Sequence, residues 1–212
     1  MKQKGILIVV SGFAGTGKST VVKMLAEKYS EQYALSISMT TREPRKYETH
    51  GVEYFFSTKE EFERTIAEDG FIEHACYIGN YYGTPRKYVE EQLEAGKDVL
   101  LEIEIQGALQ VKEKLPDTML VFVMPPSAEI LFNRLKGRGT ETDDVIRKRM
   151  LRAVEESQGI EQYDYILVND DLDVCVEGLH QMIQSEKLRA SRNIPFIENM
   201  RKELVDLKKG EV

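Results

Sequence analysis

Short apolar runs alternate with longer amphipathic stretches along most of this 212-residue chain. The apolar runs are rich in β-branched residues and have the length of buried strands. They predict strands at residues 5–10, 71–78, 99–103, 119–124 and 165–168. Apolar residues at helical spacing predict helices at 17–30, 57–68, 85–96, 107–114, 127–135, 142–159, 171–186 and 196–209. Strands separated by helices indicate a parallel sheet with right-handed crossovers.

Two segments depart from this alternation. Residues 36–84 are rich in Ser, Thr, Tyr, Arg and Glu and contain mainly short extended pieces, while residues 137–150 are rich in Arg. Ser57, with Glu60 three residues later, fits a capping box and predicts the start of a helix inside the first segment. We therefore expect a core of residues 1–35, 85–136 and 151–212, interrupted by an insertion at 36–84 and a small lid at 137–150.

Composition and charge narrow the class of protein. An apolar content of 42% is enough for a packed core, and a net charge of −7 does not favour nonspecific nucleic-acid binding. Cys76 and Cys175 are the only cysteines, have no metal-binding spacing and fit a reducing compartment. With no signal-peptide pattern and no apolar run long enough to span a bilayer, we expect a cytoplasmic protein with no nucleic-acid or membrane partner.

The strongest motif is GFAGTGKS at residues 12–19, which matches a phosphate-binding loop between a strand and a helix. Its glycines let backbone N–H groups point at an anion, and the following helix adds its partial positive charge. Lys18 is expected to reach the outer phosphates of a nucleoside triphosphate, and the Ser19 hydroxyl to ligate Mg²⁺. The alternative is a flexible surface turn, which the flanking strand and helix disfavour.

Other charged residues are candidates for a second anionic ligand. Arg42 and Arg45, with Tyr54 nearby, could bind a dianionic phosphate, although the residues alone favour a solvated basic loop. A second cluster could neutralise a transferred phosphoryl group or form an exposed helix face; it comprises Arg134, Arg138, Arg147, Lys148, Arg149 and Arg152. Glu73 could accept two N–H bonds from a guanine edge, or it could be a solvated strand-edge residue.

Taken together, these motifs resemble those of the guanylate kinase family, enzymes that phosphorylate GMP. The resemblance covers residues 5–186 in unbroken order. It rests on the phosphate loop and on SMTTREPR at 38–45, GVEY at 51–54, FIEHA at 71–75, GNYYGT at 79–84, RGTET at 138–142 and VNDDL at 168–172.

The resemblance implies a P-loop NTPase-type parallel α/β sheet flanked by helices, with a mixed, β-rich GMP-binding insertion and a small helical lid. It implies Mg²⁺-dependent transfer of the ATP γ-phosphoryl group to GMP, giving ADP and GDP, in purine nucleotide metabolism. The implied catalytic residues are Lys18, Arg45, Arg138 and Arg149. The implied ATP-binding residues are Gly12, Ala14, Gly15, Thr16, Gly17, Lys18, Ser19, Thr20, Arg134 and Asn169. The implied GMP-binding residues are Ser38, Arg42, Arg45, Tyr54, Glu73, Tyr82, Thr84 and Glu104. The implied Mg²⁺ ligands are Ser19 and, through a water molecule, Glu102.

The chain also departs from the family pattern. Phe13-Ala14 replaces the usual Pro-Ser, Thr84 replaces a frequent Ser, and Glu102-Ile103-Glu104 replaces Asp-Ile-Asp. Each extra methylene would move a carboxylate by about 1–1.5 Å, which leaves the detailed roles of the two glutamates open.

Three other functions compete with this one. They are a guanylate-kinase-like protein-interaction module without catalysis, another nucleoside monophosphate kinase, and a GTPase. An intact phosphate loop disfavours the first, and the lack of an Asn-Lys-x-Asp motif disfavours the last. The sequence leaves the oligomeric state open between a monomer and a small homo-oligomer.

Overall fold

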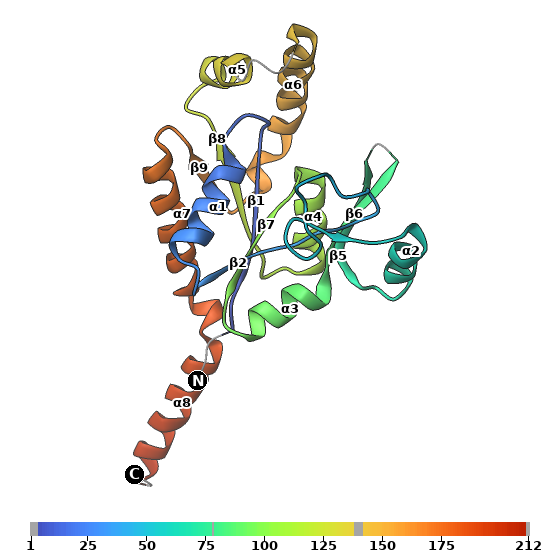
Figure 1. The fold of residues 1–212 in the computed structure, drawn as a ribbon. Coiled ribbons are helices and arrows are strands. Elements are labelled where there is room, and N and C mark those ends of the chain that lie inside the picture. Colours follow the sequence, from blue (N-terminus) through green and yellow to red (C-terminus); the bar gives the residue numbers. More distant parts are fainter. Residues whose placement is uncertain (1–3, 78, 138–141, 211–212) are drawn as a thin grey trace.

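The expected α/β architecture is present in a computed structural model that describes residues 4–77, 79–137 and 142–210 (Figure 1). Its main sheet has five strands in the order β2-β7-β1-β8-β9, and every neighbouring pair is parallel. These strands are β1 (Leu7–Gly12), β2 (Tyr33–Leu35), β7 (Asp98–Glu102), β8 (Met119–Met124) and β9 (Tyr165–Val168). Their carboxyl ends meet at one edge, where open parallel sheets bind ligands.

Helices cover both faces of this sheet, so its central strands are apolar on both sides. Ile8 and Val10 face α1 (Lys18–Lys28) and α7 (Leu172–Lys187), whereas Leu7 and Val9 pack in a second cluster with residues of other helices. The helices of that second side include α3 (Arg86–Glu94), α4 (Ile105–Lys114), α5 (Ala128–Gly137) and α6 (Asp143–Glu156), and α6 is followed by the 3₁₀ helix η1 (Ser157–Gln162).

A second, smaller sheet lies within residues 39–85, one residue beyond the expected insertion, and has the order β4-β3-β6-β5. Its strands are β3 (Met39–Thr40), β4 (Phe55–Phe56), β5 (Phe71–Tyr77) and β6 (Asn80–Pro85). The sheet is mixed, because β3 runs parallel to β4 and antiparallel to β6. Helix α2 (Lys59–Ala67) packs on it through Phe62, whose ring stacks on Phe71 and Tyr81 at centroid distances of 4.4 and 5.3 Å.

Two predicted helix starts are wrong. Thr58, not Ser57, caps α2, since its hydroxyl accepts the Glu61 N–H at 3.1 Å. The Ser57 N–H instead donates to the Thr40 carbonyl at 2.9 Å, extending the pairing with β3. Helix α4 begins at Ile105, two residues before the predicted Gly107.

The predicted C-terminal helix is present as α8 (Ile194–Lys209), which follows the short 3₁₀ helix η2 (Ala190–Arg192). Figure 1 shows α8 projecting from the body, with the chain end at its far tip. Within the described residues, no helix is both long and apolar enough to cross a bilayer.

Candidate functional site

The phosphate loop follows β1 and has the backbone geometry that the motif requires. Gly15 and Gly17 have φ values of 94° and 83°, in the left-handed region that favours glycine. A Cβ at Gly12 would lie 2.4 Å from the Val123 carbonyl oxygen, so only glycine fits there as well. The loop therefore presents its backbone N–H groups at the N-terminus of α1, where an anion is favoured.

Contacts within the motif and with Asn169 and Phe122 outside it hold this loop in place. The Thr16 hydroxyl donates to the Phe13 carbonyl at 3.0 Å, and the Asn169 amide donates to the Thr16 carbonyl at 2.7 Å. The Phe13 ring is buried and packs edge-on against Phe122, with centroids 5.1 Å apart. The departure at Phe13 thus anchors the loop in the core.

Near the start of α1 lie three side chains that could bind a triphosphate and its metal ion: Lys18 and Ser19 of the helix itself and Glu102 at the end of β7. The Ser19 hydroxyl donates to Glu102 Oε1 at 2.6 Å, and Lys18 Nζ lies 3.9 Å from the same oxygen. A hydroxyl beside a carboxylate is an oxygen donor set that suits Mg²⁺, which in kinases takes its remaining ligands from phosphates and water. Among the residues that the structure describes, no group of three or more His, Cys, Asp or Glu side chains could form an all-protein metal cage.

A cavity of about 200 Å³ adjoins the phosphate loop on the side of β9 and α7. It is lined by Gly15, Thr16, Gly17, Thr20, Arg134, Asn169, Asp170 and Leu172. Arg134 closes one side by donating to the Asn169 carbonyl at 2.8 Å. The structure thus brings Thr20, Arg134 and Asn169 together beside the loop. We call this group and residues 12–20 the phosphate-loop half of the site.

The insertion supplies a second group, the insertion half: Ser38, Arg42, Arg45, Tyr54, Glu73, Tyr82 and Thr84. Arg42 donates to both carboxylate oxygens of Glu48 at 2.9 Å and lies 5.4 Å from the centre of the Tyr54 ring. Tyr54 and Tyr82 are neighbours, with ring centroids 6.1 Å apart. Three predicted phosphate-binding side chains therefore gather here, and the guanidinium is held by Nη2, which contacts both Glu48 oxygens, and by Nη1, which donates to the Glu43 carbonyl at 2.7 Å.

Glu48 organises the loop that carries both arginines. Besides Arg42, it accepts the Arg45 backbone N–H at 2.8 Å, and the Arg45 side chain is exposed. The Arg45 N–H, and then the Arg42 guanidinium, hold the pKa of the Glu48 carboxyl below its ordinary value. Glu48 is not among the residues predicted from the sequence. Its position six residues after Arg42 is the sequence signal that could have identified it as a partner of Arg42.

Glu73 and Thr84 form a buried polar pair on the neighbouring strands β5 and β6. Glu73 is 9% exposed and Thr84 is fully buried, and the Thr84 hydroxyl donates to Glu73 Oε1 at 2.6 Å. Burial raises the pKa of the Glu73 carboxyl, and the Thr84 hydrogen bond opposes that shift. Gly107 of α4 is a neighbour of Glu73, and a Cβ there would lie in van der Waals contact with Glu73 Oε2 at 3.5 Å. A helical glycine at this position leaves room beside the carboxylate.

Ser38 is partly buried and directly precedes β3.

Glu104 links the core to α6. Its carboxylate accepts from Arg152 at 3.0 Å, and Arg152 also donates to Glu156 at 2.8 Å. The sequence placed Arg152 in the basic cluster but predicted no separate role for it. Its partner Glu104 lies 48 positions away in the sequence. Arg149 is a partly buried residue of the same helix, and Arg138 lies outside the described residues.

Comparisons with known proteins agree with this geometry. The family model for guanylate kinase matches residues 4–186. A guanylate kinase from Latilactobacillus sakei subsp. sakei (strain 23K) is 48% identical over 200 residues, covering 94% of this chain and 98% of that protein. Another, from Caldanaerobacter subterraneus subsp. tengcongensis, is 48% identical over 205 residues, covering 97% and 99%. The crystal structure of guanylate kinase from Anaplasma phagocytophilum has a TM-score of 0.70 at 30% identity, covering 100% of this chain and 98% of that one.

Proposed function

The chain belongs to the guanylate kinase family, and we propose that its two half-sites transfer the γ-phosphoryl group of ATP to GMP, giving ADP and GDP. The observation that carries the substrate assignment is the buried Glu73 carboxylate, held by Thr84 in the same chain as an intact phosphate loop. The loop accounts for a triphosphate donor, and Glu73 accounts for the base of the acceptor.

Guanine recognition follows from the hydrogen-bonding capacity of Glu73. The guanine edge offers N–H donors at the ring nitrogen and at the exocyclic amino group, and a carboxylate can accept both. Adenine has an acceptor at the same ring nitrogen, which would leave the buried charge without a donor. Thr84 keeps one carboxylate oxygen oriented, and Ser38 is proposed to contact the base as well.

The GMP phosphate is assigned to Arg42, Arg45, Tyr54 and Tyr82. Arg42 Nη2 donates to both Glu48 oxygens and Nη1 donates to the Glu43 carbonyl, and the same guanidinium N–H groups suit phosphate oxygens. The incoming phosphate takes over donors that Glu48 now holds. Because a GMP phosphate oxygen is already anionic, it attacks without a protein base, and alignment and charge neutralisation supply the catalysis.

The phosphate-loop half of the site is assigned to ATP, the phosphoryl donor. Backbone N–H groups of the loop bind the phosphates, and Lys18 neutralises charge on the outer ones. We assign the adenine to the cavity beside Asn169 and Arg134. Arg149, with Arg138, is proposed to act on the phosphoryl group in transfer, and Glu104 to lie near the monophosphate.

The residues present fit Mg²⁺, which Ser19 would hold directly and Glu102 through a water. When bound, the ion would neutralise phosphate charge. We further propose that the insertion at 36–84 closes over GMP and the lid at 137–150 over ATP, which excludes water as a competing acceptor. A cytoplasmic location and a role in purine nucleotide metabolism stay predictions.

The proposal is tested by measuring ADP release from ATP and Mg²⁺ with GMP, AMP, CMP and UMP in turn, against a control without acceptor. We expect rapid turnover with GMP and only background rates with the other three. Turnover with AMP at a similar kcat/KM would assign the chain to another nucleoside monophosphate kinase activity. No turnover with any acceptor would favour the protein-interaction module.

A further inference from the structure

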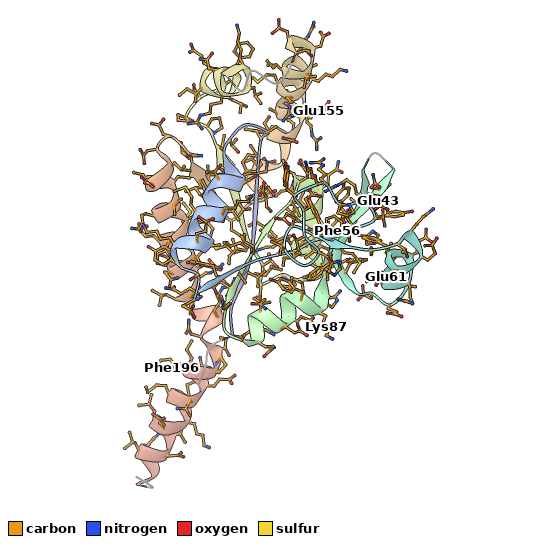
Figure 2. All side chains as sticks on the ribbon, viewed as in Figure 1. Glu43, Phe56, Glu61, Lys87, Glu155 and Phe196 are labelled. Atoms are coloured by element: carbon orange, nitrogen blue, oxygen red, sulfur yellow. The ribbon has the colours of Figure 1, made fainter. Side chains whose placement is uncertain are left out.

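Helix α8 carries a stripe of apolar side chains that the rest of the chain leaves exposed. Phe196, Leu204 and Leu207 are 68%, 58% and 56% exposed, and Met200 is 42% exposed. Figure 2 shows Phe196 on the helix that projects from the body. A row of large exposed apolar side chains along one helix indicates a surface that binds another protein.

The spacing of this stripe identifies the type of surface. The exposed Met200, Leu204 and Leu207 and the partly buried Ile197 have successive separations of three, four and three positions from Ile197 on, which is the a/d pattern of a coiled-coil heptad, and Phe196 takes the adjoining g position. In that register Glu203 occupies a g position, while Arg201 and Lys208 occupy e positions. The seam therefore has an acidic edge and a basic edge.

These edges make the helix complementary to a second copy of itself. In a parallel pair, a g residue faces the e residue five positions later on the other helix, so Glu203 meets Lys208 of the second copy. An antiparallel pair brings g against g and e against e, which would place the like-charged edges together. The charge pattern therefore favours the parallel arrangement.

The base of α8 is fixed to the body, so the helix is already formed and oriented. Arg192 donates to the buried carboxylate of Glu186 at 3.0 Å, and Tyr165 donates to the same carboxylate at 2.6 Å. The Asn193 amide donates to the carbonyls of Lys187 and Arg189 at 2.9 Å each. A preformed helix lowers the entropic cost of association, which matters for a seam this short.

We propose that α8 is a self-association element that pairs with α8 of a second copy of this chain as a parallel two-helix coiled coil. The apolar stripe forms the seam, and the two Glu203–Lys208 pairs fix its direction. This inference is independent of the phosphotransferase activity, because none of its residues belongs to either half of the site.

The first test measures the mass of the full-length protein by sedimentation over a wide dilution series. We expect a dimer for the wild type and a dissociation constant at least about tenfold higher for Leu204→Glu, which places a charge in the seam. Val205→Glu is the matched control, since it makes the same change at an exposed position beside the seam. Unchanged GMP-dependent turnover verifies that both variants are folded. A wild-type monomer at every concentration overturns the proposal, as does equal weakening by both variants or no weakening by Leu204→Glu.

The second test measures the direction of pairing. Leu207→Cys in a Cys76→Ser background puts one exposed thiol at a d position, and a parallel pair brings the two thiols together. We expect a disulfide-linked dimer under mild oxidation, and none from Val205→Cys in the same background. Association of the Leu207→Cys variant without a disulfide cross-link overturns the parallel arrangement.

Discussion

The phosphate-loop half of the site is built mainly from backbone, whereas the insertion half is assembled from side chains of several separate segments. Gly12, Gly15 and Gly17 give the loop its shape through steric and dihedral constraints that the neighbouring core enforces. In the insertion half, Arg42 and Glu73 instead depend on particular side-chain partners, Glu48 and Thr84. Under the proposed function, the first half binds the triphosphate mainly through its backbone, and the second supplies the selectivity for the acceptor.

This difference separates two kinds of mutational effect. Changes in the phosphate-loop half are expected to lower turnover for every acceptor, because they act on the transferred group. Changes in the insertion half are expected to alter which acceptor is used and how tightly it binds. Four predictions test this division, beginning with the largest effect.

Lys18→Met removes the only charged group that the motif places at the outer phosphates. We expect kcat to fall by about three orders of magnitude with GMP, because charge on the phosphoryl group is no longer neutralised. Lys23→Met, at an exposed position on the same helix, is the control and should retain normal turnover. Near-normal turnover of a folded Lys18→Met protein would refute the assigned role.

Glu73→Gln keeps the shape of the side chain but removes the second acceptor for guanine. We expect kcat/KM for GMP to fall about a hundredfold, while the value for AMP changes little, so that the preference between them narrows. Steady-state assays with both nucleotides measure this, and the exposed Glu68→Gln is the control. A parallel loss with both acceptors would show that Glu73 acts on folding or closure instead of on the base.

Arg42→Lys keeps the positive charge but replaces the bidentate fork with a point charge. We expect KM for GMP to rise about tenfold, with a smaller change in KM for ATP. Lys46→Ala changes an exposed cation in the same loop and should leave both values near those of the wild type. A rise confined to ATP would contradict the assignment of Arg42 to the acceptor phosphate.

The smallest predicted effect concerns stability and pH. Burial raises the pKa of the Glu73 carboxyl above its ordinary value of 4.5, so the folded chain binds this proton more tightly than the unfolded chain does. The contribution of Glu73 to stability is therefore fully present below pH 4.5 and is lost as pH rises through the raised pKa.

Glu73→Gln resembles the neutral form and should raise Tm at neutral pH by about 2–4 °C, corresponding to about 1 kcal/mol. The gain should disappear near the ordinary carboxyl pKa, and Glu68→Gln should show no such trend. Thermal melts of the nucleotide-free protein over a pH series measure this. A gain that stayed constant with pH would rule out ionisation of Glu73 as its cause.

The strand, loop and helix of the phosphate-loop motif could be predicted from the sequence because the motif is local. The glycines, Lys18 and Ser19 occur within eight consecutive positions, between an apolar strand and an amphipathic helix. The residues of the insertion half come from distant segments, so their roles followed from the family resemblance and not from spacing. Glu48 and Arg152 act through partners that local patterns do not reveal.

The incorrect helix start at Ser57 has a cause in the tertiary structure. Ser57 has the local pattern of a cap, but its backbone pairs with Thr40, which belongs to another strand. A contact between distant segments thus overrides the local preference. Gly107 has the local pattern of a helix boundary, yet it lies inside α4, where its nearest side-chain neighbour is Ile103.

The contact between Gly17 and Asn169 limits how this protein can evolve. A Cβ at Gly17 would lie 2.7 Å from the Asn169 amide nitrogen, and a φ of 83° independently disfavours any side chain there. Asn169 in turn supplies the hydrogen bond that holds the Thr16 carbonyl. A side chain at position 17 would clash with Asn169, and a substitution of Asn169 would remove the hydrogen bond that holds the loop at Thr16. Gly17 and Asn169 lie far apart in the sequence but act as one structural unit, so a chimera that exchanges only one of them must keep a compatible residue at the other.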